Sequence, residues 1–186
     1  MSCESRLNET KVVTWMIWIR LFIFLLGLIT LSLGISTTIQ VQYLGIHPWD
    51  VLSVGLYDNL GLSIGSWNII IGIVLTTISF ILDRTYVKWG TFINLFIVGI
   101  FVDFFLWLDF LPKATNSWLD IIIISCGIVI MGIGGGLYNS VNLGAGPRDG
   151  FMLSISDKTG YSIRAVRITT ETLVLIIGLL IGGPVF

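Results

Sequence analysis

The sequence predicts an all-α integral membrane protein in which five transmembrane helices form an inverted repeat. Three observations support this fold class: an apolar composition, long apolar stretches, and a motif that occurs twice. Of the 186 residues, 55% are hydrophobic and 11% are charged, and the mean hydropathy is +0.95. A soluble core does not need so much apolar surface, so we expect the chain to lie in a lipid bilayer.

Five apolar stretches approach or reach the roughly 20 residues that a helix needs to cross a bilayer core of about 30 Å. They are residues 15–39, 67–82, 90–108, 118–141 and 166–183. The first is expected to be a retained helix, because the tail before it mixes acids with bases and no cleavage site follows a short apolar region. The sequence therefore predicts a short tail at 1–13 and a single multi-pass membrane domain at 14–186.

The basic residues are distributed unevenly, and this predicts the orientation of the chain. Nine of the ten would lie on one side of the membrane: Arg6, Lys11, Arg20, Arg84, Lys88, Arg148, Lys158, Arg164 and Arg167. Basic residues near the ends of spans are retained on the cytoplasmic side. We therefore expect the N-terminal tail in the cytoplasm and the end of the fifth span outside.

A seven-residue motif occurs twice, as LGIHPWD at 44–50 and as LGAGPRD at 143–149, which is 99 positions later. Turn-forming, polar and small residues agree at the same or nearly the same shift: Asp58 with Asp157, Gly61 with Gly160, Ser63 with Ser162, Gly27 with Gly127, and Gly34 with Gly134. Self-similarity of this kind indicates an internal repeat.

Each repeat is predicted to consist of a helix, a Pro-x-Asp segment and a second helix, with a third helix in the first repeat only. Repeat one covers 14–110 and repeat two covers 113–186. Three helices per unit is an odd number, so the two units would have opposite orientations, as in many transporters. Repeat two ends before a counterpart of the third helix. This indicates either a truncated chain or a face that a second copy of the protein covers.

The Pro-x-Asp segments are predicted to be half-helices. Proline suits the first turn of a helix, and an acid two residues later complements the positive helix end. About 11 residues at about 1.5 Å each span roughly 16 Å, or half a bilayer. Two such helices, entering from opposite faces, would meet near the midplane with their amide groups available to an anionic group. The alternative is an amphipathic helix that lies at the membrane interface.

Eight residues are candidates for binding a solute: His47, Pro48, Asp50, Asp103, Pro147, Arg148, Asp149 and Glu171. His47 is the only histidine, and it either handles protons or is an ordinary loop residue beside a proline. Arg148 either binds an anion at one mouth of a pore or only satisfies the cytoplasmic bias of basic residues.

Two of these candidates are acids within predicted spans, where an ionisable group is costly unless it is paired or hydrated. Asp103 has no basic neighbour in the sequence, so it is either a proton or cation site or a structural hydrogen-bond acceptor. Glu171 lies four residues after Arg167 on the same helical face, where a simple ion pair would neutralise it.

Other polar and small residues of the spans are expected to join helices, through hydrogen bonds or close approach: Asn94, Thr76, Thr77, Ser79, Gly132 with Gly136, and Gly178 with Gly182. Cys3 and Cys126 are expected to be ordinary thiols, and no metal-ligand spacing occurs. We expect no metal, no cofactor, no catalytic set of residues and no nucleic-acid-binding patch.

Three segments carry a family resemblance: LGIHPWDVLSVGLYDNLG, WGTFINLFIVGIFVDFF and LGAGPRDGFMLSISDKTGYS. The motif residues in them are Pro48, Asp50, Gly90, Thr91, Asp103, Pro147 and Asp149. On these residues the chain resembles the YczE/YyaS/YitT family, and within it the YczE-like members. The resemblance implies a multi-pass protein of the bacterial cytoplasmic membrane without an assigned substrate, some members being associated with antibiotic production. Relatives continue past residue 186, which implies that the last helix is absent here.

Three functions are weighed. The inverted repeat and the acids within spans favour a transporter or channel for a small solute. In that case the protein would not be an enzyme. The alternative is a non-transporting membrane accessory or regulatory protein. The third, an intramembrane aspartyl hydrolase, would need Asp50 and Asp103 to meet, and nothing in the sequence places them together. The expected partners are the bilayer, an unidentified small solute and a second copy of the chain.

Overall fold

The chain is all-helical in the computed structural model, which describes residues 3–184 and the side chains from residue 15 onward. The side chains of Cys3, Arg6 and Lys11 lie outside the described part. Seven α-helices and two short 3₁₀ helices follow one another: α1 (Cys3–Ile39), η1 (Gln42–Leu44), α2 (Pro48–Leu60), α3 (Ile64–Leu82), η2 (Arg84–Tyr86), α4 (Trp89–Trp107), α5 (Leu119–Ser140), α6 (Pro147–Thr159) and α7 (Ile163–Leu180).

The residues that recur in the two motif regions are those that begin and end helices. Pro48 and Pro147 occupy the first turns of α2 and α6, where a missing amide hydrogen costs nothing. Both helices are followed by a glycine at φ 75°, Gly61 and Gly160, a conformation that glycine adopts without strain. The next helices then start after a capping serine, as at Ser63, whose hydroxyl accepts from the amide of Ser66 at 3.1 Å.

Four helices of the described chain are long and apolar enough to cross a membrane: α1 over Trp15–Ile39, and α3, α4 and α5 over their whole lengths. The fifth predicted span corresponds to α7. Its 18 residues carry Arg164, Arg167 and Glu171, and it is not among the four. The protein is therefore an all-α membrane protein with at least four helices of membrane-spanning character.

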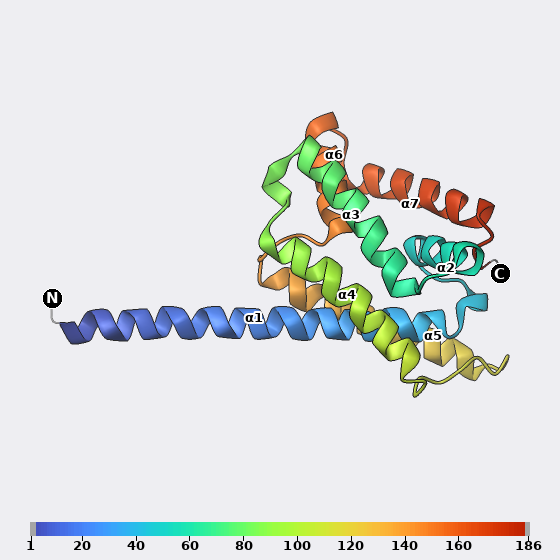
Figure 1. Ribbon diagram of the computed structural model, residues 1–186, viewed down its shortest axis with the longest axis horizontal. Coiled ribbons are helices and arrows are strands. Elements are labelled where there is room, and N and C mark those ends of the chain that lie inside the picture. Colours follow the sequence, from blue (N-terminus) through green and yellow to red (C-terminus); the bar gives the residue numbers. More distant parts are fainter. Residues whose placement is uncertain (1–2, 185–186) are drawn as a thin grey trace.

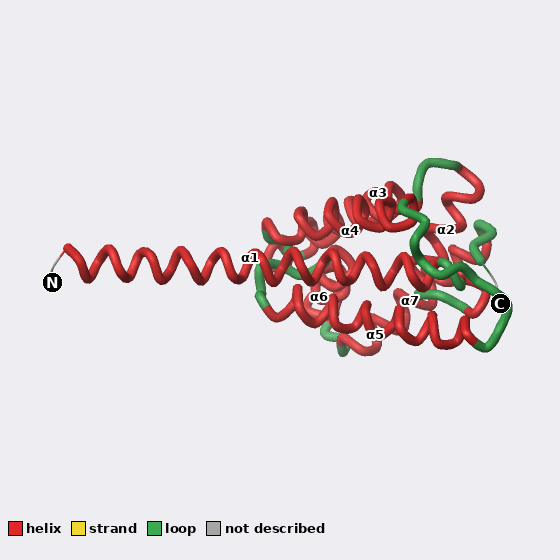
Figure 2. The backbone as a smooth tube through the Cα atoms, turned by 90° about the horizontal axis from the view of Figure 1, so that it is seen from below, coloured by secondary structure: helices red, strands yellow, loops and turns green. Residues whose placement is uncertain are grey.

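Helix α1 lies between α4 on one side and α5 on the other (Figure 2), and its N-terminal part projects beyond the other helices (Figure 1). Glycines bring α1 and α5 into close contact. A Cβ added at Gly27 would lie 3.0 Å from the carbonyl oxygen of Gly134, and one added at Gly34 would lie 2.9 Å from that of Gly127. The contact is crosswise, because the early glycine of each helix meets the late glycine of the other.

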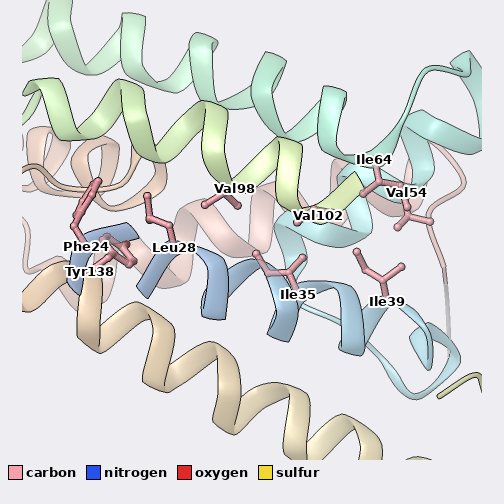
Figure 3. Packing of buried hydrophobic residues seen from close by; sticks show 9 residues of the cluster. All are labelled: Phe24, Leu28, Ile35, Ile39, Val54, Ile64, Val98, Val102 and Tyr138. Carbon is pink, nitrogen blue, oxygen red and sulfur yellow. The ribbon is translucent and has the colours of Figure 1, made fainter. Parts of the chain in front are cut away.

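The apolar core lies mainly between α1 and α4. Figure 3 shows Leu28 and Ile35 of α1 close to Val98 and Val102 of α4. At one end of this core, the ring of Phe24 meets that of Tyr138 on α5 edge to face, with centroids 6.3 Å apart. Such aromatic pairs add stabilisation beyond the burial of their surface.

The remaining helices pack in two further pairs, α2 with α7 and α3 with α6. Gly178 lies against α2, where a Cβ would come within 3.0 Å of the Leu52 amide nitrogen. By contrast, a Cβ added at Gly132 or Gly136 would meet no atom of the described chain within 4 Å. The predicted close approach at Gly132 and Gly136 is therefore absent among the described helices.

Candidate functional site

A cavity of about 170 Å³ lies where the N-terminal ends of α2 and α6 come together. The middle parts of α3 and α4 form one wall, and α1, α5 and α7 contribute the rest. The polar residues that line it are His47, Asn68, Asn94, Tyr138, Arg148, Asp149, Arg167 and Glu171. Both Pro-x-Asp segments therefore border one cavity inside the bundle.

The two helix ends differ in how they are capped. At α2, the side chain of His47 accepts from the amide of Trp49 at 3.4 Å. At α6, the equivalent residue is Gly146, and no side chain of the described residues caps the helix. A Cβ at Gly146 would lie 3.0 Å from the hydroxyl oxygen of Tyr138. A larger side chain at Gly146 would crowd this hydroxyl and extend into the cavity, which gives a physical reason for the difference between the two motifs.

An ion pair joins the starts of the two helices. The guanidinium of Arg148 donates to Asp50 Oδ1 at 3.2 Å and to Asn68 Oδ1 at 2.6 Å. The carboxylate of Asp50 is fully buried, and its other oxygen has no hydrogen-bond partner in the described structure. A buried carboxylate is tolerated only with a partner of this kind.

A second group of charged residues lies on the α7 side of the cavity. Asp149 accepts from the hydroxyl of Tyr138 at 2.7 Å and lies 3.5 Å from the guanidinium of Arg167. Arg167 also approaches Glu171 at 3.4 Å, as expected from their spacing, and Glu171 lies 3.9 Å from His47. Two carboxylates, Asp149 and Glu171, and two guanidinium groups, Arg148 and Arg167, thus line the cavity, and the buried carboxylate of Asp50 is paired with Arg148.

The eight candidate residues divide into two groups by location. His47, Pro147, Arg148, Asp149 and Glu171 line the cavity. Pro48 begins α2 beside it, and Asp50 is joined to it through Arg148.

Asp103 lies elsewhere, in a second pocket that Asp58 also lines, toward the C-terminal end of α4. It accepts from the hydroxyl of Ser63 at 2.5 Å and from the amide of Gly65 at 2.7 Å, so it caps the start of α3. In these contacts Asp103 is a structural hydrogen-bond acceptor, which is one of the two roles expected for it. Asp50 and Asp103 have separate partners in separate parts of the bundle.

Four cavity residues were not among the candidates: Asn68, Asn94, Tyr138 and Arg167. A charged or polar residue within an apolar span was the available signal for each. Asn94 was expected to bond another helix, yet its amide nitrogen is buried without a partner among the described residues. The sequence interpretation of Arg167 was as the neighbour that neutralises Glu171 and as one of the basic residues that orient the chain.

The comparisons with known proteins fit this architecture. The family described as "Family of unknown function (DUF6198)" matches residues 18–186. The chain belongs to this family. It is similar to two proteins of Bacillus subtilis strain 168, "Uncharacterized membrane protein YczE" and "Uncharacterized protein YyaS". The first is 40% identical over 159 residues, which cover 86% of this chain and 73% of YczE.

The second, YyaS, is 37% identical over 164 residues, covering 86% of this chain and 80% of YyaS. An "Uncharacterized protein" of Haemophilus influenzae is 31% identical over 167 residues, or 90% of this chain and 74% of that protein. No solved structure matches the chain. The resemblance to the YczE and YyaS proteins is confirmed, and with it the assignment to membrane proteins.

Proposed function

We propose that this membrane protein is a transporter or channel for a small solute, which binds in the cavity between α2 and α6. The observation that carries the proposal is that the starts of both short helices, with their charged residues, border one cavity inside a bundle of apolar helices. Ionisable groups within a membrane domain are expensive and are found where a solute or ion passes. Helix starts that meet inside the bundle are a common way to build such a site.

The proposal includes an inverted repeat, in which α1, α2 and α3 correspond to α5, α6 and α7. The crosswise contacts of Gly27 with Gly134 and of Gly34 with Gly127 support it, since a two-fold relation between equivalent units pairs residues in this manner. The packing of α2 on α7 is likewise the counterpart of the packing of α6 on α3. Trp49 and Arg148, which occupy equivalent positions, contact each other, with the guanidinium 5.7 Å from the ring centroid.

In this arrangement α7 is the fifth span, although its charges distinguish it from the other four. Arg167 and Glu171 line the cavity, so two of its three charged side chains would be shielded from lipid by the rest of the bundle. Arg164 lies in the first turn of α7, where a long basic side chain can reach the membrane surface. Charged residues that face a cavity are the usual exception to the apolar composition of a span.

The N-terminus is proposed to be cytoplasmic. The hydroxyl of Tyr86, in the turn that carries Arg84 and Lys88, donates to Asp157 near the end of α6. This contact supports placing the basic turn between α3 and α4 on the same side as Lys158. Their shared location is what the bias of basic residues toward the cytoplasm requires.

Flux through purified protein in vesicles tests the proposal. Vesicles with and without the protein would be mixed with small neutral, anionic, cationic and zwitterionic solutes, and swelling would be followed by light scattering. Protein-dependent swelling with at least one solute is expected, together with its loss in Gly146→Leu, which fills the cavity. Gly132→Ala, on the open face of α5, is the matched control and should swell as the wild type does. Absence of flux for every solute would favour the non-transporting accessory role instead.

A further inference from the structure

Among the described residues, the first amides of α6 are free to donate hydrogen bonds to an acidic group, whereas those of α2 already have acceptors. In α2 the amide of Asp50 donates to the carbonyl oxygen of His47 at 2.8 Å, and the His47 side chain caps the amide of Trp49. In α6 the first amide that donates is that of Gly150, to Gly146 at 2.7 Å. The amides of Arg148 and Asp149 donate to no other described residue, so both are available at the positive end of a 13-residue helix.

A buried side chain points to the same place. Asn94 is 5% exposed and lines the cavity, and its Nδ2 atom has no hydrogen-bond partner in the described structure. This atom lies beside the helix start, because it would be 3.4 Å from a Cβ built on Gly146. A buried amide donor without a partner calls for a ligand atom or an ordered solvent molecule that accepts its hydrogen bond. The Asn94 donor and the start of α6 therefore lie next to each other.

The charges around the cavity add a second requirement. The cavity lining carries the carboxylates of Asp149 and Glu171 and the guanidinium groups of Arg148 and Arg167, and the buried Asp50, paired with Arg148, makes three carboxylates to two guanidinium groups. A simple anion at the α6 helix start would raise the excess of negative charge in a region of low dielectric, where such repulsion is strong. A simple cation would leave the helix start and Asn94 without a partner. A ligand that carries both charges satisfies both parts of the site.

We propose that the cavity binds a small zwitterion of the α-amino acid class, with its carboxylate at Asn94 and the α6 helix start and its ammonium toward the carboxylates. This inference rests on the proposed function, since it names the class of the solute. The cavity has a volume of about 170 Å³. It is well below the range of drug-sized ligand pockets, so the ligand is as small as alanine or serine.

Equilibrium binding of three probes to the full chain in lipid nanodiscs tests the inference. The probes are alanine, propionate and ethylamine at neutral pH, with titration calorimetry as the readout. Propionate lacks the amine of alanine, and ethylamine lacks the carboxylate. Alanine should bind. Propionate and ethylamine should each bind at least about tenfold more weakly, because a site built for two charged groups rejects a ligand that leaves one part of the site unpaired. Equal binding of alanine and either analogue, or no binding of alanine, would overturn the proposal.

Two variants locate the carboxylate. Asn94→Leu removes the donor at similar size and Asn94→Asp places a negative charge beside the proposed carboxylate, so both should weaken alanine binding about tenfold or more. Thr77→Val is the matched control, because Thr77 is exposed and bonds only to Ile73 of its own helix; its affinity should equal that of the wild type. Unchanged alanine affinity in a folded Asn94 variant would contradict the assignment, and the three-probe comparison remains decisive if neither variant folds.

The binding test and the flux test together distinguish failure of the zwitterion site from failure of the transport proposal. Alanine binding without flux of any solute would overturn the transport proposal and leave the zwitterion site in place. Flux of another solute without alanine binding would overturn the zwitterion site and leave transport in place.

Discussion

The guanidinium of Arg148, in the first turn of α6, lies 3.2 Å from the fully buried carboxylate of Asp50, in the first turn of α2. One ion pair thus connects the starts of the two short helices. Trp49 occupies the position in α2 that Arg148 occupies in α6, so only one of the two helices supplies a base. The pair holds Arg148, which lines the cavity, against α2, so the stability of this region should be sensitive to loss of either member.

Arg148→Met should lower the free energy of unfolding by about 3 kcal/mol, because it leaves the carboxylate of Asp50 buried without a partner. Asp50→Asn in the same chain should restore part of this loss, since the remaining amide carries no charge. The stability of the two single variants and the double variant would be measured by unfolding in one detergent. Additive effects, with no coupling above about 0.5 kcal/mol, would mean that the two groups do not interact.

Two glycines on α5 provide a matched test of the packing. In Gly134→Ala the new Cβ would lie 2.3 Å from the amide nitrogen of Leu31 on α1, so the backbones must separate. A loss of about 1–3 kcal/mol is expected. Gly132→Ala meets no described atom within 4 Å and should stabilise the helix by about 0.5–1 kcal/mol. Melting temperatures in detergent would show opposite shifts, and shifts of the same sign would contradict the contact between α1 and α5.

Asp103 should prove to be a structural residue. Asp103→Asn keeps an oxygen that can accept from the Gly65 amide, so it should change stability little and leave solute uptake intact. Asp103→Leu removes the cap of α3 and should lower the free energy of unfolding by about 1–2 kcal/mol. Uptake into vesicles and thermal melting would be compared for both variants. Loss of uptake in a stable Asp103→Asn protein would instead assign the carboxylate a part in transport.

The orientation of the two units can be tested by labelling. In a background with Cys3→Ser and Cys126→Ser, single cysteines at Asp58 and Asp157 would be treated with a membrane-impermeant maleimide on intact cells and on inverted vesicles. Asp58→Cys should label from outside, and Asp157→Cys from the cytoplasmic side, because the bias of basic residues places the ends of α2 and α6 on opposite faces. Labelling of both from one side would rule out the inverted repeat.

The sequence predicted most of the helices because their signals are local. The apolar stretch that begins at Trp15 ends at Ile39, as the first span does, and Pro48 and Pro147 begin helices because of their own chemistry. The composition of the cavity was less predictable. Whether Asn94 faces a neighbouring helix or the cavity depends on how α4 is rotated against α1 and α3, and these contacts connect residues far apart in the sequence. The same reason explains why Tyr138 was missed and why Gly132 and Gly136 lack the predicted contact.

The proposed transporter or channel must open the cavity to each side of the membrane in turn or at once, and cysteine accessibility tests this requirement without knowledge of the solute. In the same cysteine-free background, Met131→Cys places a thiol at the cavity, and Ile133→Cys places one on the exposed apolar face of the same helix. A membrane-impermeant thiosulfonate would be added to one side of oriented vesicles at a time. A transporter or channel predicts modification of Met131→Cys from either side and none of Ile133→Cys. Modification of Met131→Cys from one side only, or from neither, would contradict the account.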